Sequence, residues 1–172
     1  MRRISLTGPE SAGKSTLAAQ LAAHYRTQWV PEYARAYLEK NGSSYTLADL
    51  EAIGRGQLAA EDAAAPQAAG LLFCDTDLLV VKIWAENAFS TCPAWVLAEL
   101  ACPRYALTLL LAPDLPWAPD PLREHPDPAQ RWHFYELYRA ELQRLRWPFA
   151  EISGPAGQRL ARAVEIIGGL ER

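Results

Sequence analysis

A glycine-rich segment near the start of the chain has the residue types and spacing of a phosphate-binding loop. Gly8, Gly13, Lys14 and Ser15 form the pattern G-x-x-x-x-G-K-S, which directly follows residues 2–7, a predicted buried strand. The two glycines permit backbone conformations that a Cβ would block, so the N–H groups of the loop can turn inward around a polyphosphate. The lysine then reaches the outer phosphates, and the serine hydroxyl is suited to ligate Mg²⁺.

The predicted nucleotide-binding residues are Gly8, Pro9, Glu10, Ser11, Ala12, Gly13, Lys14, Ser15 and Thr16. An acidic side chain inside such a loop is unfavourable beside phosphates. We therefore expect Glu10 to point away from them, or toward a substrate or a metal ion. The motif alone leaves open whether the nucleotide is a phosphoryl donor, a switch or a fuel.

The elements that must position this loop alternate between apolar strands and helices. Strands are predicted at residues 2–7, 27–30, 70–74, 104–111 and 148–152. Helices are predicted at residues 14–26, 32–40, 46–65, 76–88, 93–101, 129–146 and 156–170. Residues 70–74 are apolar throughout, which is typical of a parallel strand covered on both faces. We therefore expect one α/β domain over residues 1–172, a three-layer P-loop NTPase sandwich with a five-stranded parallel sheet flanked by helices.

Composition and charge exclude several classes of protein. The chain has 172 residues, of which 50% are apolar and 22% charged, as expected for one globular domain with a substantial core. A net charge of −3 without a Lys/Arg-rich run argues against nucleic acid as a partner. Three cysteines without CxxC spacing indicate neither a disulfide framework nor a zinc site. With no signal-like or membrane-length apolar segment, we expect a cytoplasmic protein without membrane contact.

Acidic residues follow two of the predicted strands, at the edge of the sheet where ligands of parallel α/β proteins bind. Asp75 follows an apolar strand as a Walker B acid does, and we expect it to hold Mg²⁺ together with Ser15. The alternative is that it caps the helix that follows. Glu32 and Asp77 are both candidates for the general base that orients an acceptor hydroxyl, and the residues do not decide between them.

Three arginines are candidates for clamping phosphate charge, because the planar guanidinium fork matches phosphate oxygens. They are Arg35, Arg123 and Arg131. The last two lie in residues 112–131, a polar, proline-rich segment that we predict to be a lid that closes over the phosphates and excludes water. For each arginine alone, a solvated surface position is the alternative.

Aromatic side chains near the strand ends could bind a flat ring. Tyr33, Tyr37, Trp84 and Trp117 lie at strand ends or on helices that leave them. A pair of them could stack on a cationic ring, with stacking and cation–π attraction each contributing about 1 kcal/mol. A place in the core is the alternative for each one alone.

Four segments of the sequence form a specific combination: the loop Gly8–Ser15, Glu32-Tyr33-Ala34-Arg35, Asp75-Thr76-Asp77, and Pro116-Trp117-x-x-Asp120-x-Leu122-Arg123. Taken together, they resemble the ribosylnicotinamide kinase domain of NadR-type proteins. Proteins of this family are P-loop kinases that use ATP to phosphorylate the ribose 5′-hydroxyl of nicotinamide riboside. The resemblance extends over about residues 2–165.

The resemblance implies an adenylate-kinase-like core, an arginine-bearing lid, aromatic stacking on nicotinamide and an acid near the ribose. By position, Tyr33 and Trp117 match the aromatic residues of the family, and Arg35 and Arg123 match its basic residues. Residues 124–128, Glu-His-Pro-Asp-Pro, replace a small Ser/Gly-type turn, which bears on lid geometry and acceptor choice. We do not expect the adenylyltransferase or DNA-binding activity of longer family members.

The leading hypothesis is ATP- and Mg²⁺-dependent phosphoryl transfer to the 5′-hydroxyl of a ribonucleoside, with nicotinamide riboside as the first candidate. The predicted catalytic residues are Lys14, Arg123, and Glu32 or Asp77; the predicted substrate-binding residues are Tyr33, Arg35, Asp77, Trp84 and Trp117. One alternative is a P-loop ATPase that acts as a nucleotide switch or regulator. Another is a kinase for a different nucleoside. A small-molecule nucleoside is the expected partner, and a homo-oligomer is left open.

Overall fold

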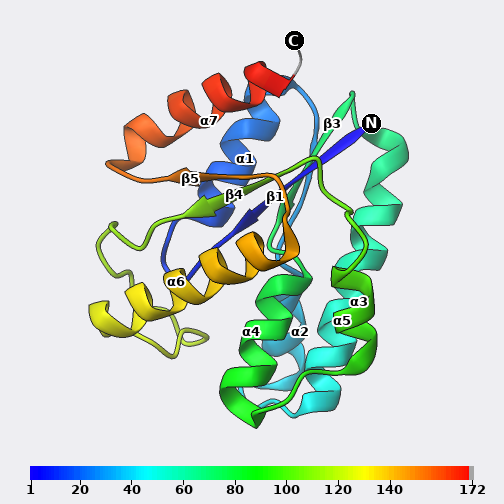
Figure 1. The fold of residues 1–172 in the computed structure, drawn as a ribbon, viewed down its shortest axis with the longest axis vertical. Helices are drawn as coiled ribbons and strands as arrows, with labels where there is room; N and C mark the ends of the chain where they lie inside the picture. The colour runs from blue at the N-terminus through cyan, green and yellow to red at the C-terminus, as the bar shows by residue number, and fades with distance from the viewer. Residues whose placement is uncertain (171–172) are drawn as a thin grey trace.

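The computed structural model describes residues 1–170 and contains, within them, one sheet of five parallel strands (Figure 1). The strands lie in the order β2-β3-β1-β4-β5. Their bounds are Arg2–Thr7 for β1, Gln28–Val30 for β2, Leu71–Asp75 for β3, Leu107–Leu111 for β4 and Phe149–Ile152 for β5. The predicted α/β class and the five-stranded parallel sheet are confirmed.

Helices cover both faces of this sheet. They are α1 (Lys14–Tyr25), α2 (Tyr33–Asn41), α3 (Leu47–Ala64), α4 (Leu78–Phe89), α5 (Ala94–Leu100), α6 (Pro128–Leu145) and α7 (Ala156–Leu170), with a 3₁₀ turn η1 at Ala65–Gln67. Helices α1 and α7 pack on one face, and α2 to α6 contribute to the core on the other (Figure 1). The result is the predicted three-layer arrangement.

The central strands are buried on both faces, as their unbroken apolarity predicts. Every residue of β3 and β4 is buried. Because successive side chains of a strand point to opposite faces, Leu72 and Cys74 join the core beneath α2 to α6. Leu71 and Phe73 join the core beneath α1 and α7.

Side-chain caps fix where three of the helices begin. Helix α3 begins with a capping box, because the Asp49 N–H donates to Thr46 Oγ1 and the Thr46 N–H donates to Asp49 Oδ2. Helix α4 starts at Leu78 and not at the predicted residue 76, because Asp77 is its N-cap. Helix α6 starts one residue earlier than predicted, with Asp127 as its N-cap.

The strand order places the carboxyl ends of β1, β2, β3 and β4 at one edge of the sheet. Central β1 leads into the glycine-rich loop, and its neighbour β3 ends at Asp75. Strand β2 leads to Glu32, and β4 leads to residues 112–127, which connect it to α6. No helix within residues 1–170 is long and apolar enough to cross a membrane.

A buried acid lies near the start of β1. Glu61 of α3 is fully buried and accepts a 2.8 Å hydrogen bond from the Tyr105 hydroxyl. Arg3 and Arg104 each approach its Oε2 atom at 3.4 Å. Burial raises the pKa of Glu61 to about 7, although the tyrosine and the two arginines act to lower it.

This raised pKa predicts a pH-dependent stability. The folded chain holds a proton on Glu61 that the unfolded chain releases, so the contribution of Glu61 to stability is complete below about pH 4.5 and lost between about pH 4.5 and 7. The loss proceeds at up to about 1.4 kcal/mol per pH unit. Urea unfolding should show that the parent loses free energy of unfolding relative to Glu61→Gln as the pH rises from 5 to 7.5. The difference between the two proteins should therefore grow in favour of Glu61→Gln. Glu165→Gln, at an exposed position, is the matched control, and an equal rise there would contradict this account.

Candidate active site

The loop between β1 and α1 has the backbone conformation of a phosphate-binding loop. Gly8 has φ +133° and Gly13 has φ +82°, values that L side chains rarely adopt. A Cβ built on Gly8 would lie 2.6 Å from the Leu111 carbonyl oxygen, so β4 also excludes any larger residue there. Gly13 is the N-cap of α1 and gives it no side-chain cap, so the first N–H groups of this helix are left for an anion.

Lys14 lies over this loop. Its Nζ atom donates to the carbonyl oxygens of Gly8 and Pro9, each at 2.9 Å. These bonds hold the ammonium group on the side of the loop that lines a cavity of about 160 Å³. The positive charge therefore stands where the motif predicts the outer phosphates.

This cavity brings together many of the residues predicted from the sequence. Those that line it are Gly8, Glu10, Ser11, Ala12, Gly13, Lys14, Ser15, Thr16, Glu32, Arg35, Trp84 and Arg123. The rest of its wall is mostly apolar, from α2, α4, α6 and the lid: Ala34, Leu38, Val80, Leu122 and Tyr138. Phosphate-binding groups and an apolar surface thus share one cavity, as a donor and an acceptor would need.

Asp75 and Ser15 form a pair that fits a magnesium ion. Asp75 is buried, its carboxylate is hydrogen-bonded to the Ser15 side chain, and its Oδ1 atom has no hydrogen-bond partner. Burial raises the pKa of Asp75, and the bond to Ser15 and the charge of Lys14 oppose that rise. A hydroxyl beside an unpaired carboxylate oxygen is the oxygen-donor set that Mg²⁺ prefers. Within residues 1–170, no group of three or more His, Cys, Asp or Glu side chains could hold a metal ion.

Glu32 is half-buried and lines the same cavity. Burial raises the pKa of its carboxyl, the charge of Lys14 lowers it, and the charge of Asp75 raises it further. An acid with a raised pKa in a cavity, close to a lysine and a second acid, has the properties of a general base.

Asp77, the other candidate base, is placed differently. The Ser5 hydroxyl donates to its Oδ2 at 2.6 Å, and the Leu79 N–H donates to its Oδ1 at 2.9 Å. It is 1% exposed and is not among the residues that line the cavity in the described chain. Both carboxylate oxygens are thus used to join β1 to α4. The structure therefore brings Glu32, and not Asp77, to the cavity.

Two of the three predicted phosphate-binding arginines line the cavity, and the third does not. Arg35 and Arg123 line the cavity, and Arg35 pairs with Asp120 of the lid at 3.1 Å. Arg131, predicted to contact phosphate, is 3% exposed and donates to backbone carbonyls of the loop. Trp117 lies beneath the guanidinium groups of Arg123 and Arg131, which are 5.8 and 5.6 Å from the centre of its ring. It is not among the described residues that line this cavity.

Trp84 is the predicted aromatic residue that reaches the cavity. Its ring stacks on Tyr45 with 5.2 Å between ring centres and an angle of 24°. Tyr33 is 37% exposed, and a Cβ on Gly56 would lie 2.2 Å from its ring, so this tyrosine packs on α3. The sequence reasoning missed Tyr45 and Tyr138. Tyr45 directly precedes Thr46, the N-cap of α3, and the predicted helix start at residue 46 is the signal that could have placed it near a helix end.

Residues 112–127, which belong to the predicted lid, are hydrogen-bonded to the loop. The Glu10 carboxylate accepts from the backbone N–H groups of Glu124 and His125, with shortest distances of 3.0 Å to each, and the Ser11 hydroxyl accepts from the Ala118 N–H at 3.0 Å. The Glu10 carboxylate is thus bonded to the backbone of residues 124 and 125, and Glu10 also lines the cavity. A smaller cavity of about 30 Å³ lies beside this contact and is lined by both Glu10 and His125.

These features define a P-loop nucleotide-binding protein. The sequence matches the family model described as AAA domain over residues 3–159, and the chain belongs to this family. It is 28% identical to the trifunctional NAD biosynthesis/regulator protein NadR of Escherichia coli (strain K12), over 97% of this chain and 42% of that protein. The NadR protein of Salmonella typhimurium gives the same identity and coverage. The chain thus spans about two fifths of the length of these curated relatives.

Solved structures show the same fold. A crystal structure of NadR protein in complex with NR has a TM-score of 0.80 at 22% identity, over 98% of this chain and 51% of that chain. A deoxyadenosine kinase from M. mycoides, with products bound, has a TM-score of 0.66 at 12% identity, over 97% of this chain and 99% of that chain. These likenesses confirm the nucleotide-kinase-like fold predicted from the sequence.

The close approach of Gly8 to β4 predicts a large effect of one methyl group. Gly8→Ala should lower the free energy of unfolding by about 2 kcal/mol or more, because the Cβ meets the Leu111 carbonyl at a strained φ. Gly157→Ala in α7 is the control: its Cβ meets nothing within 4 Å and should stabilise by about 0.5–1 kcal/mol. Urea unfolding measures both. A Gly8→Ala protein as stable as the parent would show that this contact is not tight.

Proposed function

We propose that this chain is an ATP-dependent kinase that phosphorylates the 5′-hydroxyl of a ribonucleoside. The leading acceptor is nicotinamide riboside, with nicotinamide mononucleotide as the product. The observation that carries the proposal is the shared cavity, in which the phosphate-binding loop, Glu32 and an apolar wall with Trp84 face the same space. The likeness to NadR, one structure of which is described as a complex with NR, supports the choice of acceptor.

The donor half of the site would bind the ATP phosphates through the loop N–H groups and the start of α1. Lys14 and Arg123 would balance the charge of the migrating phosphoryl group. A magnesium ion bound by Ser15 and Asp75 would supply further neutralisation of the phosphates. Closure of the lid would exclude water, which otherwise competes as the acceptor.

The acceptor half would use Glu32 as the base. Its carboxylate orients the ribose 5′-hydroxyl and takes its proton as the bond from that oxygen to the γ-phosphorus forms and the β–γ bridging bond breaks, which releases ADP. Because burial raises the pKa of Glu32, the carboxyl retains its proton to a higher pH than a free glutamate does. A raised pKa makes the ionised carboxylate a stronger base toward the acceptor proton than a free glutamate would be.

The base of the nucleoside would bind between the apolar side chains of the cavity wall. Trp84, supported by Tyr45, offers a flat face for stacking, and Leu38 and Val80 add apolar surface. Two other functions remain as alternatives: a nucleotide switch and a kinase for another nucleoside. Arg35 and Arg123 of this chain already line the cavity, which favours a kinase over a switch that takes its arginine from a partner. The likeness to deoxyadenosine kinase keeps other nucleosides in the test.

An acceptor screen tests the proposal. Purified protein with Mg-ATP should release ADP much faster with nicotinamide riboside than with water alone, and the product should carry a 5′-phosphate. Common nucleosides and nucleoside monophosphates are assayed in parallel. Lys14→Ala should abolish turnover, which shows that the loop is responsible. If none of the acceptors accelerates ADP release, the kinase proposal fails.

The assignment of the base predicts a contrast between two carboxylates. Glu32→Gln should lower kcat by about 10²–10⁴-fold with ATP affinity retained, and should remove the acidic limb of the pH–rate profile, which should lie above the ordinary glutamate pKa of 4.5. Asp77→Asn should lower stability by about 1 kcal/mol, because an amide oxygen can still cap Leu79 N–H but the second acceptor, used by the Ser5 hydroxyl, is lost; turnover should stay close to that of the parent. A larger kcat loss in Asp77→Asn than in Glu32→Gln would reverse the assignment.

A further inference from the structure

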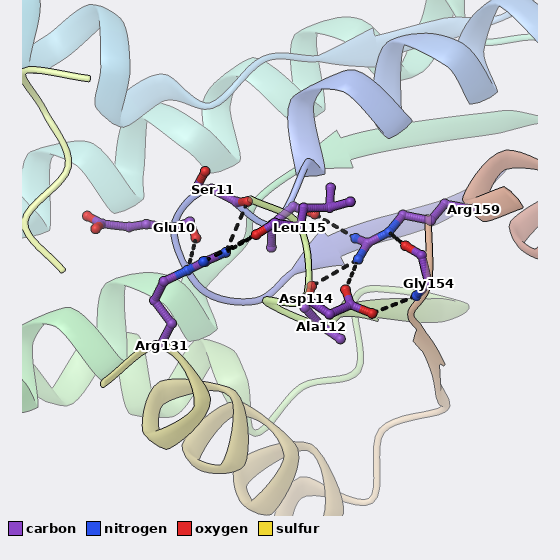
Figure 2. A network of polar contacts seen from close by, with 9 residues as sticks. Glu10, Ser11, Ala112, Asp114, Leu115, Arg131, Gly154 and Arg159 are labelled. Carbon is purple, nitrogen blue, oxygen red and sulfur yellow. Dashed lines mark hydrogen bonds and ion pairs between the residues drawn. The ribbon is translucent and has the colours of Figure 1, made fainter. Parts of the chain in front are cut away.

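Two buried arginines grip consecutive carbonyl groups of the phosphate-binding loop. Arg131 comes from the first turn of α6 and Arg159 from α7, and Figure 2 shows the two guanidinium groups reaching the loop from different helices. Arg131 donates to the carbonyl oxygens of Glu10 at 3.3 Å and Ser11 at 3.2 Å. Arg159 donates to the carbonyl oxygen of Ala12 at 2.8 Å. Three successive peptide groups are thus held by side chains distant in sequence.

Each guanidinium group is itself fixed by further bonds. Arg131 also donates twice to the Leu115 carbonyl oxygen, at 3.3 Å each. Arg159 also donates to the carbonyl oxygens of Gly154 at 2.9 Å and Ala112 at 3.1 Å, and pairs with Asp114 (Figure 2). These bonds leave each guanidinium little freedom, so the loop carbonyls are held against fixed groups.

Because the peptide group is planar, holding the loop carbonyl groups in place also fixes the direction of the loop N–H groups. In a planar trans peptide, the carbonyl of one residue and the N–H of the next point in opposite directions. Holding the carbonyls of residues 10–12 toward the arginines therefore directs the N–H groups of residues 11–13 away from them. N–H groups of Gly13 and its neighbours in such loops bind the phosphates.

We propose that Arg131 and Arg159 are positioning residues that hold the loop in its phosphate-binding conformation. Each is 3% exposed, and neither lines the cavity that holds Lys14, so they act through the loop backbone and not by touching a phosphate. Leu115 and the start of α6 belong to the lid and its end, so Arg131 also joins the lid to the loop. The inference depends on the proposed function only in that the loop binds a polyphosphate.

Binding of inorganic tripolyphosphate, measured by calorimetry, tests this role without requiring an acceptor or turnover. Arg131→Gln and Arg159→Gln should each weaken binding by about tenfold to a hundredfold, by analogy with the loss of a group that orients a metal ligand. The matched controls are Arg144→Gln in α6 and Arg162→Gln in α7, exposed arginines that pair with Glu141 and Glu165 on their own helices. Both controls should bind as the parent does.

Hydrogen exchange separates positioning from a general loss of stability. In Arg131→Gln and Arg159→Gln, exchange should rise at the amides of residues 11–13 while the β3 and β4 amides stay protected. Arg131→Lys and Arg159→Lys keep the charge but lose the planar fork, and they carry the test if a glutamine variant does not fold. Tripolyphosphate affinity equal to that of the parent in folded variants would overturn the inference. If the parent binds tripolyphosphate and the arginine variants bind it more weakly, but the parent phosphorylates no nucleoside, the proposed function fails and the inference stands.

Discussion

The structure depends on how one short run of backbone satisfies its polar groups. The loop that follows β1 must leave N–H groups free for an anion, so its carbonyl groups need partners on the other side. Those partners are the buried guanidinium groups of Arg131 and Arg159, together with the ammonium group of Lys14 on the carbonyls of Gly8 and Pro9. Three cations therefore surround a loop that is itself built to bind negative charge, and α6, α7 and residues 112–127 are all bonded to it.

The parallel sheet then brings the remaining chemistry to this loop. Central β1 has β3 beside it and β2 one strand further, so Asp75 and Glu32 arrive next to Lys14 from separate elements. Asp75 and Asp77 are only two positions apart, yet they have different partners in the structure. Asp75 ends β3 with one carboxylate oxygen unpaired, whereas Asp77 turns back to cap α4 and to accept from Ser5. Burial raises the pKa of both acids, so their pKa values do not distinguish them and their hydrogen-bond partners do.

The fold was predictable because it is encoded locally. Apolar runs of strand length, the G-x-x-x-x-G-K-S motif and the Thr46–Asp49 capping box each specify their own element, and alternation of strands and helices specifies the parallel sheet. Residues directly after strands were predictable as site candidates for the same reason. The contacts of Arg131 were not predictable, because its partners are backbone carbonyls, which leave no trace in the sequence. Arg159 and Tyr138 lie on helices. Helical periodicity predicts the helix, but it does not show that Arg159 contacts the loop or that Tyr138 lines the cavity.

The central claim is that a single cavity holds the phosphoryl donor and the acceptor together. A linked compound with adenosine at one end and nicotinamide riboside at the other, joined 5′ to 5′ by a chain of phosphates, tests it most directly by calorimetry. The account predicts one compound bound per chain, tighter than ATP or the nucleoside alone, and displaced by either of them. Displacement by ATP but not by the nucleoside, with affinity no greater than that of ATP, would contradict it.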